Sequence, residues 1–174
     1  MKAFDELIQQ DLKWVSKGSF KKNHELRTSD DEVVATMIQP SAWSNRVEVE
    51  APGNRWSFER KGFWQQYILI QSVGTGSEPA RFTYRKGGAL EFPDGRVFHW
   101  KNNFWGNKWA WTTADDEPVI GFKTGGLLTL NGEVRVDEDS SDLKALPLLM
   151  FLGWYLINLY YQDAAATTTF VAAT

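Results

Sequence analysis

The feature of this sequence that most constrains its fold is an uncharged, apolar run from Ala145 to Tyr161, ALPLLMFLGWYLINLYY. Arranged as a helix, the run is apolar on every side, so the helix must be buried in a protein core or in lipid. Asp142 precedes it as an N-cap, and Pro147 falls in the first turn, where its missing N–H costs little. The run therefore predicts one buried helix over about residues 142–161.

The length and the flanks of the run distinguish these two environments. At 1.5 Å per residue the run is about 25 Å long, slightly short of the roughly 30 Å hydrocarbon thickness of a bilayer. Its flanks fit insertion poorly, because four acidic residues lie between 137 and 142 and no Lys or Arg follows Lys144. We favour burial in a protein core. A C-terminal membrane anchor below a separate soluble β domain is the alternative.

Composition narrows the classes of function. A chain of 174 residues suffices for one domain, taken as 1–174, with a sizeable core. Its net charge of −3 argues against a nucleic-acid partner, since such proteins are usually basic. The absence of cysteine excludes disulfides and thiolate metal sites, and the first residues lack the apolar segment of a signal peptide. We expect a monomeric, cytoplasmic protein.

Residues from about 13 to 136 alternate between apolar and polar with a period of two, which is typical of half-buried antiparallel strands. Turn signals separate the apolar pairs, and Asn131-Gly132 is the strongest of them because this dipeptide favours a two-residue hairpin turn. A short amphipathic helix is expected over residues 2–11. The apolar pairs are Val34/Thr36/Ile38, Val47/Val49, Trp56/Phe58, Phe82/Tyr84, Leu90/Phe92, Phe98/Trp100, Trp109/Trp111, Leu128/Leu130 and Val134/Val136.

Eleven or twelve short strands followed by one apolar helix have a simple solution, because closing the sheet removes its edges. Twelve strands about 4.8 Å apart and tilted by about 40° form a barrel of roughly 12 Å radius. Side chains alone cannot fill that width, but a helix about 10 Å across fits along the axis. We predict a mainly β fold: a closed antiparallel barrel of about twelve strands enclosing the C-terminal hydrophobic helix.

Two short motifs carry a resemblance to a known family. Asp142-Leu-Lys-Ala145 leads into Phe151-Leu-Gly-Trp-Tyr-Leu-Ile-Asn-Leu-Tyr-Tyr161, and Trp105-Gly106 is followed by Trp109, Trp111, Asp115 and Pro118-Val119. Together they resemble the tubby C-terminal-domain-like superfamily, which includes phospholipid scramblases and LURP-one-related proteins. The resemblance implies a twelve-stranded barrel around a central helix. It also implies a mostly non-enzymatic role, such as binding membrane phosphoinositides or moving lipids.

The acidic segment before the helix is a weak candidate for calcium. Asp137, Asp139 and Ser141 occupy positions one, three and five of a calcium-loop pattern. Asp142 stands where the pattern requires glycine, and Leu148 stands where it requires a bidentate glutamate. We therefore keep Asp137, Asp139 and Asp142 only as weak candidates, and favour a solvated acidic loop without a metal or other cofactor.

Basic pairs are the candidates for contacting a lipid headgroup. No motif assigns any of them, and neighbouring residues on a strand point to opposite faces, so a pair is not a patch. Solvated strand ends are the simpler interpretation. The candidates are Lys21, Lys22, Arg60, Lys61, Arg85 and Lys86.

Signals for catalysis are weak. The two histidines, His24 and His99, lie far apart in sequence, and neither a phosphate-binding loop nor a nucleophile motif is evident. We expect no catalytic residues.

The remaining unusual residues are expected to be structural. Leu149, Trp154 and Asn158 should form part of the core, with Asn158 satisfying a backbone group. The tryptophans at 100, 105, 109 and 111 are expected to pack in the core or at its rim, with stacking on sugars as the alternative.

The sequence thus predicts a non-catalytic barrel that binds an anionic membrane lipid headgroup or a protein partner, cytoplasmic or peripheral at a membrane. The net negative charge weakens the lipid version, because anionic headgroups attract basic surfaces. The anchored protein and a lipocalin-like carrier with an open cavity are the alternatives.

Overall fold

The structure, a computed structural model, describes residues 11–17, 23–41, 44–103, 105–125, 130–140 and 144–171, without the side chains of residues 86 and 168–171. The short helix expected over residues 2–11 lies outside this part of the chain.

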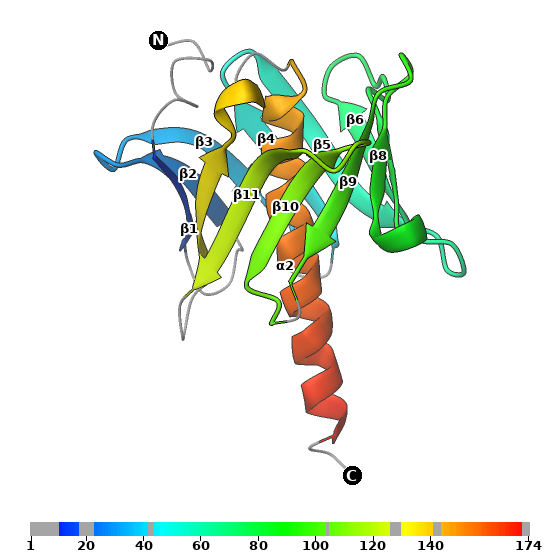
Figure 1. The fold of residues 1–174 in the computed structure, drawn as a ribbon. Coiled ribbons are helices and arrows are strands. Elements are labelled where there is room, and N and C mark those ends of the chain that lie inside the picture. Colours follow the sequence, from blue (N-terminus) through cyan, green and yellow to red (C-terminus); the bar gives the residue numbers. More distant parts are fainter. Residues whose placement is uncertain are drawn as a thin grey trace.

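A closed barrel of twelve antiparallel strands forms the body of the molecule, and each strand pairs with its neighbours in sequence (Figure 1). Pairing of the first strand with the twelfth closes it. The predicted fold class is confirmed. The strands are β1 (Leu12–Lys17), β2 (Asn23–Thr28), β3 (Val33–Ile38), β4 (Arg46–Ala51), β5 (Asn54–Lys61), β6 (Tyr67–Ser72), β7 (Arg81–Thr83), β8 (Ala89–Glu91), β9 (Val97–Asn102), β10 (Lys108–Thr113), β11 (Pro118–Gly125) and β12 (Asn131–Val136), with 3-10 turns at Arg85–Gly87 and Glu138–Ser140.

Alternation of side chains explains why these segments form strands. In β4, for example, Val47 and Val49 are buried, whereas Arg46, Glu48 and Glu50 are exposed. The same period-two pattern directs the large rings of most strands inward. The interior of the barrel is therefore lined by aromatic and aliphatic side chains.

The helix α2 (Leu146–Val171) enters this barrel and leaves it at the other end (Figure 1). Met150 and Ile157 are completely buried, which is the opposite of what the membrane-anchored alternative requires. Trp154 stacks on Trp14 of β1 at 5.4 Å between ring centroids. On other sides of the helix, Tyr155 packs against Phe58 of β5, and the Trp111 indole N–H of β10 donates a 2.8 Å hydrogen bond to the Leu149 carbonyl.

The predicted bounds of this helix, about 142–161, were wrong at both ends. It begins at Leu146, four residues after the expected start, and continues to Val171, ten residues beyond the expected end at Tyr161. Ala164 to Ala166 are strong helix formers, and they extend the helix past the rim of the barrel.

The Asn131-Gly132 turn was also predicted wrongly. Both residues belong to β12, and Asn131 pairs with Gly125 of β11, so the connection lies at residues 126–130. A Cβ atom on Gly132 would lie 2.5 Å from the ring of Trp154. The glycine therefore serves the close approach of this ring, and not a hairpin turn.

Within the part of the chain that the structure describes, no helix combines the length and the apolarity that crossing a bilayer requires.

Candidate functional site at the exit end of the barrel

The barrel has two distinct ends, because an antiparallel meander places alternate connections on opposite sides. We call the end where α2 leaves the exit end. The Tyr161 hydroxyl donates to the Gly106 carbonyl at 3.1 Å there, and Arg60 at the end of β5 pairs with Asp163. The exit end carries the described parts of connections 39–45, 62–66, 84–88 and 103–107, and the opposite, entry end carries connections 29–32, 52–53, 73–80, 92–96 and 114–117 and the segment leading into α2.

Three large aromatic side chains project from the exit end. Phe63 is 85% exposed, Trp64 is 91% exposed and Trp105 is 81% exposed. Two glycines with positive φ shape the turns that present them, Gly62 at 86° and Gly106 at 65°. A Cβ on Gly62 would lie 2.3 Å from the Gln65 carbonyl oxygen, so only glycine allows this tight turn.

The tryptophans that the sequence grouped together divide between core and surface. Trp100, Trp109 and Trp111 are buried, and Trp100 contacts the rings of both others. Core packing is confirmed for these three. Trp105 was expected in the core or at its rim, and it lies exposed instead because it occupies the β9–β10 connection and not a strand.

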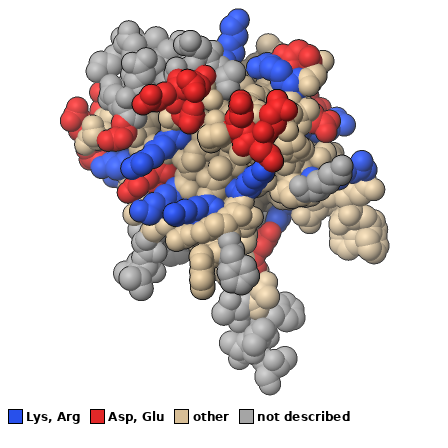
Figure 2. All heavy atoms as spheres, in the orientation of Figure 1, with Lys and Arg blue, Asp and Glu red and all other residues tan. Residues whose placement is uncertain are grey.

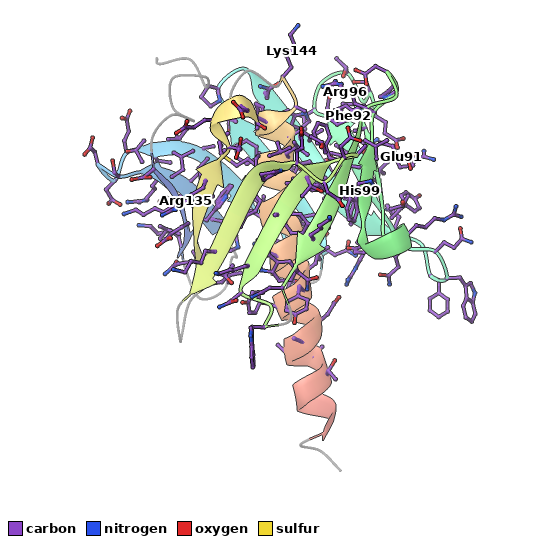
Figure 3. All side chains as sticks on the ribbon, in the orientation of Figure 1. Glu91, Phe92, Arg96, His99, Arg135 and Lys144 are labelled. Atoms are coloured by element: carbon purple, nitrogen blue, oxygen red, sulfur yellow. The ribbon has the colours of Figure 1, made fainter. Side chains whose placement is uncertain are left out.

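Charge is segregated between the two ends. The described exit-end connections contain Arg85 and Lys86 and no acidic residue. Arg96 and Lys144 are the basic residues of the described entry-end connections, and Figure 3 places both at that end. On the face that Figure 2 shows, acidic side chains gather mainly in the upper half, with a band of Lys and Arg below them. The entry-end acids are Asp30, Asp31, Glu32, Glu78, Asp94, Asp115, Asp116, Glu117, Asp137, Glu138 and Asp139.

Two lysines near the exit end face each other across strands. Lys108 of β10 pairs directly with Lys123 of β11, and both are exposed. Like charges opposite one another destabilise a sheet, although Glu133 of β12 lies across from Lys123 on the other side. The arrangement becomes favourable when an anionic surface approaches this end.

The predicted headgroup residues are only partly brought together. Arg60 donates to both carboxylate oxygens of Asp163, at 2.6 and 3.0 Å, and these bonds raise the pKa of the Arg60 side chain. Lys61 pairs with Glu59 at 2.8 Å. Arg85 makes a longer contact, 3.4 Å to the side-chain oxygen of Gln65. Lys21, Lys22 and the side chain of Lys86 lie outside the described residues.

A surface hollow of about 650 Å³ lies beside the connection 62–66, which carries Trp64. Trp64 and Gln65 form one wall, and Tyr84 and Arg85 form another. Burial raises the pKa of Tyr84 to about 12, so its hydroxyl stays protonated at neutral pH. The remaining lining comes from Gln66 of the same connection and from strands β6 to β8, which contribute Tyr67, Arg81, Thr83 and Glu91.

The two arginines of the hollow differ in how far neighbouring groups neutralise their charge. Arg81 is engaged by Glu78 at 2.9 Å, which leaves the Arg85 guanidinium as the less neutralised cation of the two. Figure 3 places Glu91 on the outer face of the barrel. The hollow thus offers a cation and a carboxylate beside aromatic rings, a set that suits a ligand with an anionic group and hydroxyls.

The acidic segment proposed as a weak calcium site lies at the entry end. The Asp139 N–H, in the 3-10 turn before α2, donates to the carboxylate of the preceding Asp137 at 3.2 Å. Among the described residues, no group of three or more His, Cys, Asp or Glu side chains is placed to hold a metal ion. Asp142 lies outside the described residues.

The interior of the barrel is filled by the helix. Leu149 and Trp154 are completely buried, and the Asn158 amide donates a 2.7 Å hydrogen bond to the Trp154 carbonyl. The hollow beside Asn158 measures about 10 Å³, room for about one water molecule and not for the ligand of a carrier. His24 is buried edge-on against Trp154, and His99 is half-buried between the inward Phe98 and Trp100.

The aromatic residues of this site are evident in the sequence, but the strand order is needed to show that they lie at the same end of the barrel. Phe63-Trp64 belongs to no motif, and the motif that contains Trp105 does not indicate that its side chain is exposed. The shared location of these three residues emerges only when alternate connections are grouped by end.

Comparison of the chain with family models, curated proteins and solved structures gave no match.

Proposed function

We propose that this protein is a non-catalytic binding module that docks onto anionic membrane surfaces through its exit end. The observation that carries the proposal is the exposure of Phe63, Trp64 and Trp105 on the same end of the barrel as Arg85 and Lys108.

Exposed aromatic rings supply the apolar part of such binding. Trp and Tyr rings favour the level of the lipid headgroups, where an apolar body and a polar edge are both accommodated. Removing a large apolar side chain from water contributes about 1.5–3 kcal/mol. Three such side chains on two connections of the same end of the barrel therefore support measurable partitioning into the interface.

The net negative charge argues against binding to anionic lipids, but the acidic residues lie mainly at the entry end, away from the proposed membrane contact. Each Lys or Arg near an anionic leaflet contributes about 1 kcal/mol, and the effect decays within a Debye length of about 10 Å at 0.1 M salt. The buried part of α2, residues 146–159, spans about 20 Å between the two ends. An acidic entry end at that distance is largely screened from a membrane that the exit end touches.

The hollow beside Trp64 is proposed as the place where a headgroup sits. Its Arg85 suits a phosphate or carboxylate, and Glu91 suits a hydroxyl donor. We also propose that the chain is a relative of the tubby-like superfamily, on the strength of the motifs quoted above and the twelve-stranded barrel around a helix. A protein partner is the second candidate from the sequence, but the pairing of exposed rings with lysines favours lipid.

The proposal is tested by co-sedimentation with phosphatidylcholine vesicles that contain or lack 30% phosphatidylserine. We expect binding to the anionic vesicles that weakens with added salt. Replacing Trp64 and Trp105 with alanine should reduce binding by at least about tenfold, because each lost ring removes about 1.5–3 kcal/mol of burial.

The matched control replaces Val33 and Val73 with alanine, because both are exposed apolar residues of the entry end. This variant should bind as the parent protein does. Failure of the folded parent protein to bind either vesicle would refute the proposal and leave a protein partner as the alternative.

A further inference from the structure

The C-terminal part of α2 projects out of the barrel at the exit end (Figure 1). Burial ends at Leu159, and residues 163–167 are exposed. The projection therefore does not contribute to the core that the first half of the helix builds.

The composition of this projection is unusual for a helix in water. From Ala164 to Thr174 the sequence AAATTTFVAAT carries no charge. Three consecutive β-branched threonines lower its helix propensity, and short helices without tertiary support are marginal in water. An apolar or interfacial environment removes the competition of water for the backbone and stabilises such a helix.

Polar groups mark the base of the projection. The Arg60–Asp163 ion pair lies there, and the Tyr161 hydroxyl contacts Gly106 and Thr124. Tyr160 packs edge-on against Trp109 at the rim. Tyrosine is one of the residues enriched where a protein passes from water into the headgroup region of a membrane.

We propose that residues 164–171 insert into the bilayer leaflet to which the exit end docks. At 1.5 Å per residue these eight residues extend about 12 Å, close to the roughly 15 Å depth of one leaflet and far short of a complete crossing. The Arg60–Asp163 pair then sets the depth of insertion. This inference rests on the proposed function and names the element that enters the lipid.

The absence of native cysteine makes the test direct, because a single introduced thiol is the only one to label. We would label Ala166→Cys with the environment-sensitive dye NBD and add vesicles containing 30% phosphatidylserine. Ser29→Cys, exposed in an entry-end turn, is the matched control. The dye at residue 166 should shift its emission to the blue and be quenched by lipids brominated on the acyl chain, whereas the dye at residue 29 should do neither.

An independent variant tests the energetics without a dye. Ala166→Glu should weaken vesicle binding by about threefold to tenfold, because a charge is costly below the headgroups. Ser29→Glu adds the same charge at the entry end and should leave binding unchanged.

The outcomes separate this inference from the proposed function. Vesicle binding with an unshifted dye at residue 166 would overturn the insertion and leave membrane docking intact. Loss of all vesicle binding would overturn both. A blue shift that rises with protein concentration in the absence of vesicles would show helix-to-helix association between copies and overturn the insertion.

Discussion

At the scale of single residues, a tight constraint on the barrel is the fit of α2 against β10 and β11. A Cβ atom on Gly153 would lie 2.6 Å from a ring carbon of Phe122 and 2.9 Å from the indole nitrogen of Trp111. Trp111 is itself held by its hydrogen bond to Leu149. The helix can therefore approach these two strands only where it lacks a side chain.

The variant Gly153→Ala tests this fit. Alanine normally improves a helix interior by about 1 kcal/mol relative to glycine, whereas overpacking a core costs about 1–3 kcal/mol. We expect the contacts with Phe122 and Trp111 to dominate, with a net loss of about 1–2 kcal/mol in the free energy of unfolding, measured by urea denaturation.

The matched control is Gly121→Ala on β11, where an added Cβ meets nothing within 4 Å. It should be neutral or slightly stabilising. A Gly153→Ala variant as stable as the parent protein would show that the helix is not packed so closely.

At the scale of elements, α2 is the core around which the strands close. About a dozen of its side chains are buried, and at about 1.5–3 kcal/mol each they exceed the whole stability of a typical domain, about 5–15 kcal/mol. Without the helix the strands enclose a large apolar void that water would enter.

Two truncations separate the buried from the projecting half of this helix. A chain ending at Ser140 should lack cooperative unfolding and native near-UV circular dichroism, because it has no core. A chain ending at Asp163 keeps the buried residues and the Arg60 ion pair, and should unfold cooperatively like the parent protein. A folded chain ending at Ser140 would contradict the assigned role of α2.

Most of the strands and the helix could be predicted from the sequence, because the alternation of apolar and polar residues shows which face of each strand is buried. The alternation in β4 and the all-round apolarity from Leu146 to Leu159 are local patterns. Gly132 was misread because the reason for its glycine is tertiary, the ring of Trp154 from another element. The end of the helix was predicted wrongly because it was placed where the apolar run stops, at Tyr161. The helix continues through Asp163, whose carboxylate pairs with Arg60, a residue distant in sequence.

At the scale of the whole molecule, the candidate site depends on which loops share an end. The pairs Arg60-Lys61 and Arg85-Lys86 were found from the sequence, but the ion pairs that neutralise Arg60 and Lys61 were not. Arg60 of β5 pairs with Asp163 of α2, and Lys61 pairs with Glu59, two residues before it on the same strand. Phe63 and Trp64 were not singled out from the sequence, and Trp105 was expected in the core or at its rim, because aromatic residues are also typical of the core. The net charge does not indicate that basic and acidic residues lie at different ends of the barrel, because it is a sum over both ends.

Membrane docking is thus expected to depend on the position of charge and not on its total, and a pair of charge-reversed proteins separates the two. Arg85→Glu with Lys108→Glu alters the exit end, and Arg96→Glu with Lys144→Glu alters the entry end. Both double variants change the net charge by the same amount. The exit-end change should not harm folding at residue 108, because the new glutamate would face Lys123.

The measurement is the partition coefficient of each protein onto vesicles containing 30% phosphatidylserine, at 0.1 M salt. At about 1 kcal/mol for each basic residue near the membrane, we expect the exit-end variant to bind at least about tenfold more weakly than the parent protein. The entry-end variant should bind within about twofold of the parent protein, because its altered charges lie more than a Debye length from the membrane. Equal weakening of the two variants would show that only net charge matters and would contradict docking through the exit end.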